Sequence, residues 1–428
     1  MEFLLLEDRQ LASSLTIETA DLLRHLDIIK KDNVERVYFC GTLVTNKRVL
    51  IFLPRNSLTS ISNSDITPPK LASNILLALH KYRSSTSVGS GESPEDQPSG
   101  LDILADIVWL LKDYISNGIY STKIRKQSFN NGKTNWNRTI RNEFPFPGNA
   151  GAPVYLNLHS EKTILNEQNA VSLIHAEVIK KLDNLFSWII TGDATIKTSS
   201  DIEYMPVISD SSEKKSALLK RELSSTYSDR ETRLLNCLIN YIDNSSEGFT
   251  GDYLIGVRVF QGVWEEMLRA TLPSVKSINH LLPKPALYLR DSNDVLLTKG
   301  MLTDIVSFVD SDVSVIDAKY YRAEGAGDSP GWADIVKQLF YAKAIQSLGL
   351  GLNISNWFAF PGKHEAITEG PIKAIGMIDP TNRLLLNADF EPIGCAYFCP
   401  IEIISRYNAN SKFSTSEVSA LYHPPNTN

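Results

Sequence analysis

Residues 301–321 read MLTDIVSFVDSDVSVIDAKYY and contain two apolar runs that are separated by a short polar segment. Such runs between polar breaks are typical of buried strands, and the polar residues 309–312 predict a turn that brings the two strands side by side. Alternate residues of a strand share one face, so Asp317 and Lys319 are expected to point in the same direction. The neighbouring strand would place Asp304 close to them.

Two carboxylates and an ammonium group in an apolar environment need partners, because an unpaired buried charge is costly. Asp304, Asp317 and the backbone carbonyl of Ala318 are oxygen donors of the kind that Mg²⁺ prefers, with waters and phosphate oxygens completing its shell. Lys319 could orient the nucleophile and stabilise the charge that develops on the phosphate. The pattern indicates phosphodiester hydrolysis with Mg²⁺, for which Mn²⁺ can substitute. The alternative is a solvated strand end with a structural Asp–Lys pair.

A predicted helix at 259–270, VFQGVWEEMLRA, precedes this strand pair. Its apolar residues recur at helical spacing, which predicts that one helix face packs on the sheet. Glu265 adjoins that face and is a candidate third carboxylate of the site, whereas Glu266 is expected to face solvent.

A second predicted helix, GWADIVKQLFYAKAIQ at 331–346, follows the strand pair. Asp334, Gln338 and Tyr341 recur at helical spacing and share one face. Gln338 and Tyr341 could therefore overlook the active site. The alternative is that both are ordinary residues of a helix surface.

The whole chain of 428 residues is too long for one compact core and predicts two or three domains. Helices and strands surround a central sheet in its last third, so the predicted fold class is α/β, as an α+β multidomain protein. Residues 160–192 are predicted to form a long helical stretch, and 395–404 the last strand. The predicted division starts with an N-terminal α+β domain at 1–83, which contains a hairpin at 35–56, and a flexible linker or loop at 84–100. A middle helical and DNA-contact region follows at 101–224. The catalytic core, with a mixed sheet flanked by helices, is predicted at 225–405, and a polar tail at 406–428.

The segment 121–141, STKIRKQSFNNGKTNWNRTIR, is cationic and contains no acidic residue, although the chain has a formal net charge of −6. Phosphate neutralisation by these side chains, with Trp136 or Phe129 as a stacking surface, would make it a DNA-contacting segment. The predicted DNA-binding residues are Lys123, Arg125, Lys126, Lys133, Trp136, Arg138 and Arg141. The alternative is a solvated loop that Trp136 and Ile140 anchor on the core.

The composition and motifs exclude several classes of protein. The 4 cysteines are too sparse for a disulfide scaffold, and no apolar run is long enough for a membrane helix, so we expect a cytoplasmic protein with no membrane partner. Gly132-Lys133-Thr134 resembles the end of a P-loop, but Gln127 occupies the position where the upstream glycine is required. The chain is therefore not expected to bind a nucleotide itself.

The order of these motifs resembles a known family. The helix with Glu265, then Asp304, Asp317-Ala318-Lys319 and KQLFY at 337–341 look like the core of the PD-(D/E)xK nucleases. VIDAKYY with DIVKQLFYAKAI resembles the LlaJI-type restriction endonucleases, which are similar in turn to McrC-type nuclease subunits. The hairpin FCGTLVTNKRVLIFLPRN, and GKTNWNRTIRNEFPF followed by PVYLNL, extend the resemblance over most of the chain.

The resemblance implies a role for each matching residue. Asp304 and Asp317 would be metal ligands and Lys319 the catalytic lysine. Glu265 would be the acid of the first helix, and Gln338 would help to order the site. Two positions depart from the pattern: Thr303 stands where the motif name has Pro, and Tyr341 follows Gln338 by three residues rather than the four common in RecB-like relatives.

The resemblance also implies a function and partners. We expect a Mg²⁺-dependent endonuclease of a restriction or phage-defence system that acts on double-stranded DNA. A separate McrB-like GTPase or AAA+ subunit, and a cognate methyltransferase of the same system, are the expected protein partners. One alternative is a non-catalytic DNA-binding or assembly subunit that retains the nuclease fold, against which the intact Asp, Asp and Lys set argues. The other is a RecB-like DNA repair nuclease.

Overall fold

A computed structural model of the chain describes residues 1–31, 33–61, 66–85, 100–148, 151–246, 252–288, 295–297 and 299–425. Two compact units divide the chain. The first comprises Met1–Leu104, Thr191–Ala194 and Gly251–Asn428, and the second comprises Ala105–Ile190 and Thr195–Thr250. Most of the predicted linker at 84–100 lies outside the described residues.

A four-stranded sheet joins the N-terminal part of the first unit to its C-terminal part. Its order is β1 (Glu2–Glu7), β5 (Arg48–Leu53), β4 (Cys40–Val44) and β11 (Tyr253–Val257). β1 is parallel to β5, and the other two pairs are antiparallel. The predicted hairpin is confirmed, with Thr45 N–H donating to the Arg48 carbonyl at 2.9 Å across the turn between β4 and β5. Because β11 completes this sheet, residues 1–83 and the region after 251 fold as one unit.

Glycine is required where β11 meets β4. The register places Gly41 opposite Gly256. A Cβ on Gly41, whose φ is +146°, would lie 2.2 Å from the Ile255 carbonyl oxygen. A Cβ on Gly256 would lie 2.3 Å from the Cys40 carbonyl oxygen, so the two backbones approach too closely for any side chain at either position.

The N-terminal part also contains a small apolar core beside this sheet. Its buried residues include Leu23, Ile28, Phe39 and Phe52. The surrounding elements are η1 (Ala12–Ser14), α1 (Ile17–His25), β2 (Ile29–Lys31), β3 (Glu35–Val37), α2 (Leu58–Ile61) and α3 (Pro68–Ser85). Thr16 caps α1 by accepting a hydrogen bond from the Thr19 N–H, as expected for a Thr at a helix N-terminus.

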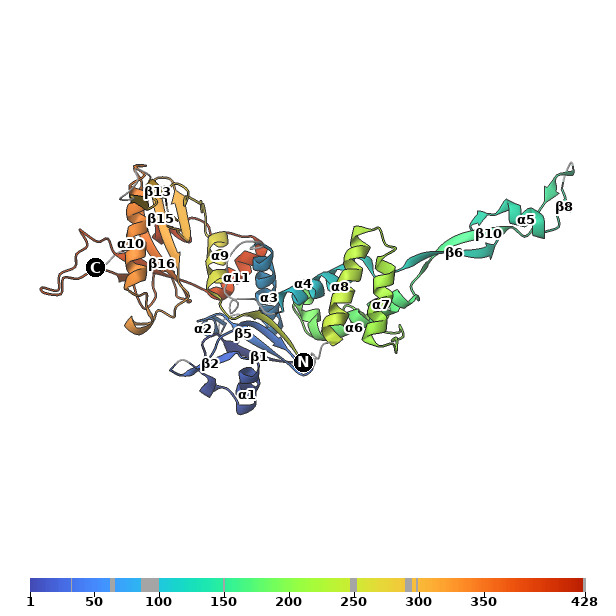
Figure 1. Cartoon of the computed structure of the whole chain (residues 1–428), viewed down its shortest axis with the longest axis horizontal. Helices are drawn as coiled ribbons and strands as arrows, with labels where there is room; N and C mark the ends of the chain where they lie inside the picture. The colour runs from blue at the N-terminus through green and yellow to red at the C-terminus, as the bar shows by residue number, and fades with distance from the viewer. Residues whose placement is uncertain are drawn as a thin grey trace. The chain divides into compact units, whose positions relative to one another are not determined.

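The predicted mixed sheet is present in the C-terminal part of the first unit. Its order is β14 (Ile305–Val309), β15 (Asp312–Ala318), β16 (Asn353–Pro361), β18 (Ile393–Phe398) and β17 (Ala374–Ile375). β15, β16 and β18 are mutually parallel, and both outer pairs are antiparallel. Figure 1 shows α10 (Trp332–Gln346) on one side of this sheet, and α9 (Gln261–Thr271) and α11 (Pro400–Ala409) on the other. The smaller pair β12 (Ala286–Tyr288) and β13 (Val295–Leu297) and η5 (Ala326–Asp328) belong to the same unit.

The face of the sheet that α10 covers determines where the predicted site lies. Val313 and Val315 of β15 belong to one buried cluster with Tyr341, Ala344 and Ile345 of α10. Residues of β15 with odd numbers therefore face α10, because side chains alternate along a strand. Asp317 continues this series at the end of the strand, on the same face.

The C-terminal segment differs from its prediction in two ways. Residues 400–404 begin α11 instead of continuing the last strand, because Pro400 lacks the N–H that a central strand needs and suits the first turn of a helix. The predicted polar tail also packs on the core. Leu421 and Tyr422 in η6 (Ser419–Tyr422) are buried, and the Tyr422 hydroxyl lies 2.7 Å from Ser307 Oγ of β14.

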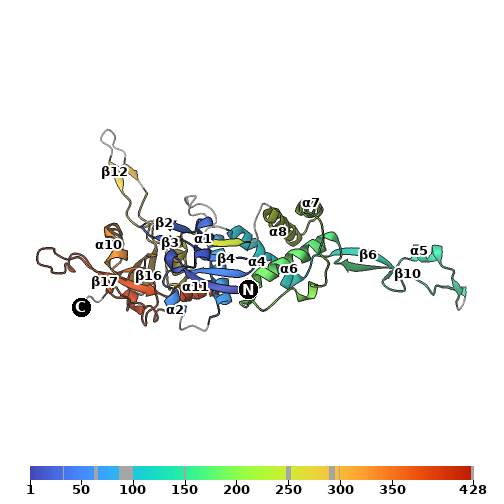
Figure 2. The ribbon, with the colours of Figure 1, turned by 90° about the horizontal axis from the view of Figure 1, so that it is seen from below.

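The second unit consists of a helical body and a two-stranded ribbon. The helices are α4 (Leu101–Asn117), α6 (Ala170–Thr191), η4 (Ser200–Ile202), α7 (Ser212–Leu223) and α8 (Asp229–Ser246). β6 (Thr122–Phe129) pairs with β10 (His159–Asn166) along its whole length, and the ribbon runs away from the helices of this unit (Figure 1, Figure 2). Shorter elements near its end are β7 (Lys133–Thr134), α5 (Trp136–Asn142), β8 (Phe146–Pro147) and β9 (Pro153–Val154).

Three features of the second unit differ from the sequence prediction. Residues 160–166 form a strand instead of the start of a long helix, which begins only at Ala170. The segment 122–129 is also a strand. α8, whose first turn Ser228 caps, packs against α7 and belongs to the second unit. The predicted catalytic core began at 225 and so included this helix, whereas the structure divides the chain near 251. Within the described part of the chain, no helix is long and apolar enough to cross a membrane.

Candidate active site

Asp317 and Lys319 lie together at the end of β15, as their spacing predicts. Asp317 is 1% exposed. Lys319 Nζ lies 2.7 Å from Asp317 Oδ2 and 2.7 Å from Asp334 Oδ1 of α10. Burial opposes the charge of Lys319, but the two carboxylates outweigh it and raise the pKa of the lysine above its usual value. The ammonium group is therefore held charged, in a fixed position beside Asp317.

Asp304 immediately precedes β14 and is brought to the same place. The Ala318 N–H donates to Asp304 Oδ2 at 3.1 Å, so the aspartate continues the pairing between β14 and β15. Burial, followed by the negative charges of Asp317 and Glu265, raises the pKa of Asp304 to about 7, and Lys337 opposes this rise. Three predicted acids are thus close enough to influence one another.

A second lysine of α10 also faces Asp317. Lys337 Nζ lies 3.5 Å from Asp317 Oδ1. Burial lowers the pKa of Lys337, but Asp317 and Asp304 outweigh it and raise the pKa above its usual value. Asp317 is therefore paired with two ammonium groups. Nevertheless, neither of its oxygens has a hydrogen bond of good geometry among the described residues.

Glu265 and Glu266 share one partner on α9. Arg269 donates to Glu265 Oε1 through Nη2, and to Glu266 Oε2 at 2.8 Å through Nη1. Arg269 Nε also donates to the Asp304 carbonyl at 3.1 Å. The two glutamates are similarly exposed, at 30% and 27% of the side chain, so Glu266 does not simply face solvent. Glu265 is the one whose charge reaches Asp304.

Gln338 and Tyr341 are buried and contact backbone groups near the acids. Gln338 Nε2 donates to the carbonyl of Val315 at 2.8 Å and to that of Trp357 at 3.3 Å, which fixes α10 against β15 and β16. The Tyr341 hydroxyl donates to the Leu302 carbonyl at 2.5 Å, two residues before Asp304. Both residues position the strands that carry the acids, and the reading of them as ordinary surface residues is wrong.

The outer face of α10 is apolar. Trp332, Val336 and Phe340 follow one another at helical spacing and are 70%, 43% and 56% exposed. Ile335 and Leu339 pack instead against Phe358 and its neighbours in the sheet.

Several residues around the site were not assigned a role by the sequence. Gln261, the first residue of α9, donates to the Ala318 carbonyl at 2.6 Å and accepts from the Tyr320 N–H at 2.9 Å. Asn279 Oδ1 accepts from the N–H of Thr303 at 2.9 Å and from its hydroxyl at 2.7 Å. Thr303 thus fixes the backbone before Asp304, at the position where the motif name has Pro. Among the residues without an assigned role, only Asp334 and Lys337 could have been suspected from the sequence, because both lie on the predicted helix that contains Gln338.

The donor set fits a hard divalent cation in part. Asp304 and Asp317 offer adjacent carboxylate oxygens, and both oxygens of Asp317 are buried and lie in ion pairs with Lys319 and Lys337. The Ala318 carbonyl already accepts from Gln261, which leaves one lone pair for a metal. The described residues contain no preformed group of three or more His, Cys, Asp or Glu side chains that could hold a metal ion. Waters and phosphate oxygens would have to complete the shell, as is usual for Mg²⁺.

The predicted DNA-binding residues lie on the ribbon between β6 and β10, which we call the arm (residues 122–166). Lys123, Arg125 and Lys126 are on β6, Lys133 is on β7, and Trp136, Arg138 and Arg141 are on α5. The partner strand brings an acid to the segment, because Asn135 Nδ2 donates to Glu161 Oε1 at 3.2 Å. The arm and the site at the end of β15 belong to different units.

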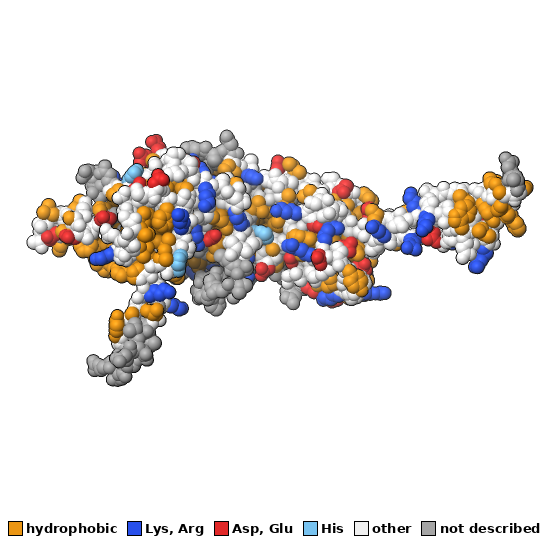
Figure 3. Space-filling view, turned by 90° about the horizontal axis from the view of Figure 1, so that it is seen from above, with side chains coloured by type: hydrophobic (Ala, Val, Ile, Leu, Met, Phe, Trp, Pro, Cys, Tyr) orange, Lys and Arg blue, Asp and Glu red, His pale blue; other side chains and the backbone are white. Residues whose placement is uncertain are grey.

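The arm also exposes apolar side chains, which gather at its end in Figure 3, beyond a stretch with Lys and Arg side chains. Trp136 is 55% exposed and Ile140 is 60% exposed. The alternative in which these two residues anchor a loop on the core is therefore wrong. The other large apolar residues exposed on the arm are Ile124, Phe129, Phe144, Phe146, Val154, Leu156 and Leu165.

Comparison with known proteins finds similarity to a curated protein and to solved structures. A protein of Bacillus subtilis (strain 168), described as "Type II restriction enzyme BsuMI component YdjA", is 25% identical over 316 residues, which is 70% of this chain and 65% of the relative. The chain thus spans less than two thirds of that relative's length. A structure of Thermococcus gammatolerans McrB AAA+ hexamers with bound McrC matches with a TM-score of 0.36 and 11% identity, over 95% of this chain and 99% of the matched chain. The cryo-EM structure of the McrBC complex of the same organism matches with a TM-score of 0.23 and 10% identity, over 62% of this chain and 88% of that chain.

The match to a protein family is more extensive. Residues 39–370 fit the family described as LlaJI restriction endonuclease. This region runs from just before β4 to the segment between β16 and β17 and includes Glu265, Asp304, Asp317 and Lys319. Because the match covers most of the chain, this protein belongs to the LlaJI restriction endonuclease family.

Proposed function

We propose that this chain is a Mg²⁺-dependent endonuclease subunit of a restriction system that hydrolyses phosphodiester bonds of double-stranded DNA. The observation that carries the proposal is the convergence of Asp304, Asp317 and Lys319 at the end of β15. Membership of a restriction endonuclease family supports it independently of that geometry.

Each side chain of the site would have a distinct task. A bound Mg²⁺ would act as a Lewis acid on the phosphate and lower the pKa of the attacking water. Asp304 and Asp317 would hold this ion. Lys319, fixed between Asp317 and Asp334, would stabilise the negative charge that develops on the phosphate. Lys337 would add a second positive charge on the same side.

We further propose a separate NTP-hydrolysing partner of the McrB type, as the family resemblance implies, with a cognate methyltransferase in the same system. The word "component" in the name of the curated relative is consistent with a multi-subunit assembly. The exposed aromatic side chains of the arm favour a macromolecular contact on this surface.

Removal of divalent metal is expected to abolish cleavage of plasmid DNA. Purified protein, alone and with the candidate NTPase and its nucleotide, is incubated with supercoiled DNA in Mg²⁺, in Mn²⁺ and in EDTA. Nicked or linear products are expected in Mg²⁺ and in Mn²⁺, and none is expected in EDTA, because the carboxylates need a cation between them and the phosphate. A folded protein that cleaves under none of these conditions would instead support the non-catalytic assembly subunit.

Neutralising the arm is expected to weaken DNA binding without changing base preference. Lys123 and Arg125 lie on the same face of β6, so Lys123→Gln with Arg125→Gln removes two charges from one surface. The slope of log affinity against log salt should fall by about two, at roughly 0.9 per phosphate contact. The matched control is Lys214→Gln with Arg221→Gln on α7, which removes the same charge from the body of the unit. If both double variants keep the wild-type slope, the arm contacts a protein partner instead of DNA.

A further inference from the structure

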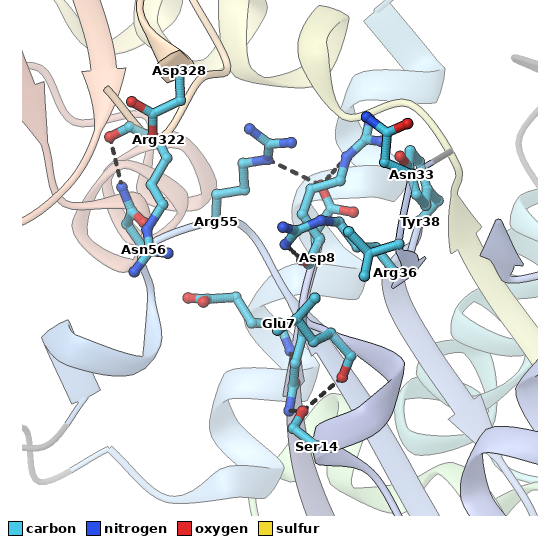
Figure 4. A pocket seen from close by; sticks show the side chains of 14 residues that line it. Glu7, Asp8, Ser14, Asn33, Arg36, Tyr38, Arg55, Asn56, Arg322 and Asp328 are labelled. Carbon is cyan, nitrogen blue, oxygen red and sulfur yellow. Dashed lines mark hydrogen bonds and ion pairs between the residues drawn. The ribbon is translucent and has the colours of Figure 1, made fainter. Parts of the chain in front are cut away.

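A cavity of about 700 Å³ lies in the first unit, outside the site described above. Its wall contains residues from the end of β1, from β3 and from the segment after β5, and it also contains Arg322 and Asp328, which follow β15. Figure 4 shows Arg322, Asn56 and Asp328 on one side of this cavity, and Asp8, Arg36 and Tyr38 on the other. A volume of this size can admit a nucleotide-sized part of a larger nucleic acid.

Four arginines line this cavity: Arg9, Arg36, Arg55 and Arg322. Arg9 stacks on the Tyr38 ring, with its guanidinium carbon 3.5 Å from the ring centre. The Nε groups of Arg9 and Arg55 are buried and have no hydrogen-bond partner among the described residues. Arg36 is held by its hydrogen bond to the Arg9 carbonyl at 2.9 Å. Tyr38, Asp8 and the Arg9 carbonyl therefore hold guanidinium groups in place in the cavity wall.

The acids of the cavity wall are largely occupied by other groups. Glu7 Oε1 accepts from the Ser57 N–H at 2.7 Å and from the Leu58 N–H at 3.1 Å. Asp328 Oδ1 accepts from the Glu324 and Gly325 N–H groups at 3.1 and 2.9 Å. Their negative charge is thereby satisfied by the backbone.

Asp8 is the exception among these acids, because it is 4% exposed and lies 3.7 Å from Arg9 Nε and 4.0 Å from Arg55 Nε. Asp8 thus holds the guanidinium groups of Arg9 and Arg55 in place through ion pairs. One of its oxygens, Oδ1, is buried without a hydrogen-bond partner in the described part of the chain. Arg322 also has an acidic partner, because its Nε lies 2.8 Å from Glu324 Oε1. Glu7 and Asp328 are bound to backbone N–H groups, so the Nη groups of the arginines are the donors that could meet a ligand.

We propose that this cavity binds a phosphate group, that of the DNA backbone next to the cleavage site. The inference rests on the proposed nuclease function. Guanidinium groups match the oxygens of a phosphate through paired hydrogen bonds. Arg322 follows Lys319 by three residues, a span of at most about 11 Å. One DNA strand carries a phosphate every 3.4 Å or so of axis, so the backbone of Arg322 lies within about three phosphates of that of Lys319.

The test uses the full-length protein and DNA binding without metal, so it does not depend on cleavage. Arg322 is the first target, because its side chain is 62% exposed and its loss leaves the core intact. Duplex affinity is measured by fluorescence anisotropy at four or more salt concentrations. The slope of log affinity against log salt should fall by about one in Arg322→Gln and by about two in Arg322→Gln with Arg36→Gln, at roughly 0.9 per contact.

Matched controls separate the cavity from net charge and from folding. Arg24→Gln with Arg83→Gln removes two arginines from other surfaces of the same unit and should leave the slope unchanged. Arg322→Lys should retain part of the slope, because it keeps the charge. Melting curves of all variants show whether any has lost its fold.

Two results would overturn the proposal. An unchanged slope in both cavity variants would show that the arginines form a structural cluster with Asp8. Tight binding of inorganic phosphate or GTP, measured by calorimetry and lost in the cavity variants while the DNA slope stays unchanged, would assign the cavity to a free phosphate compound. Because binding is read without metal, a chain that shows the expected slopes and cleaves no DNA would contradict the proposed nuclease activity and leave the phosphate site standing.

Discussion

Replacement of Lys319 by alanine is expected to reduce the rate of DNA cleavage by roughly 100- to 1000-fold, the usual effect of removing one group that stabilises transition-state charge. Lys319 is the only described ammonium group that bridges Asp317 and Asp334, both at 2.7 Å. Its loss removes the positive charge beside the phosphate and releases Asp334. Single-turnover cleavage of a plasmid in Mg²⁺ measures the change.

The matched control for this prediction is Lys343→Ala. Lys343 lies on the same helix as Asp334, in its last turn, away from the acids. The Lys343→Ala variant should cleave DNA at the wild-type rate. Lys319→Ala should retain DNA binding and a folded melting transition, which separates a catalytic loss from unfolding. Wild-type cleavage by Lys319→Ala would remove this lysine from the chemistry and favour the reading of a structural Asp–Lys pair.

The catalytic strand pair could be predicted from sequence because its signals are local. The polar turn at 309–312 pairs β14 with β15, and the two-residue period of a strand places Asp317 and Lys319 on one face. The hairpin of β4 and β5 was predictable for the same reason. In each case a few neighbouring residues contain the whole pattern.

Contacts between distant segments could not be predicted in this way. β11 pairs with β4 across more than two hundred intervening residues, and only the glycines Gly41 and Gly256 hint at the close approach. The roles of Asp334 and Lys337 depend on how α10 docks on the sheet, which helical periodicity does not determine. The domain boundary at 225 differs from the structure because it relied on local composition alone.

The arm was missed as a ribbon because its strands are polar on both faces. Most residues of β6 are exposed, and β10 alternates little between buried and exposed positions. The two-residue apolar period by which strands are recognised arises from burial of one face, and this ribbon buries neither. Its cationic composition was visible in the sequence. The exposure of its aromatic residues, which indicates a contact surface, could be recognised only from the structure.

Replacement of Asp304 by asparagine is expected to separate metal affinity from stability. The change removes a charged oxygen ligand at nearly constant shape, so Mn²⁺ affinity should fall at least about tenfold, or ~1.4 kcal/mol. The metal-free protein should not be destabilised, because the partly buried carboxylate lies beside the negative charges of Asp317 and Glu265, which disfavour its ionised form. Calorimetric titration with Mn²⁺ and melting curves with and without metal measure the two effects.

The matched control for the Asp304 prediction is Asp310→Asn, in the turn between β14 and β15. Asp310 is exposed and has a φ of +51°, a conformation that asparagine adopts readily, so this change removes one charge without strain. It should leave Mn²⁺ affinity unchanged. If Asp304→Asn binds Mn²⁺ as tightly as the wild type does, Asp304 is no ligand. Metal binding would then have to rest on Asp317 and Glu265 instead.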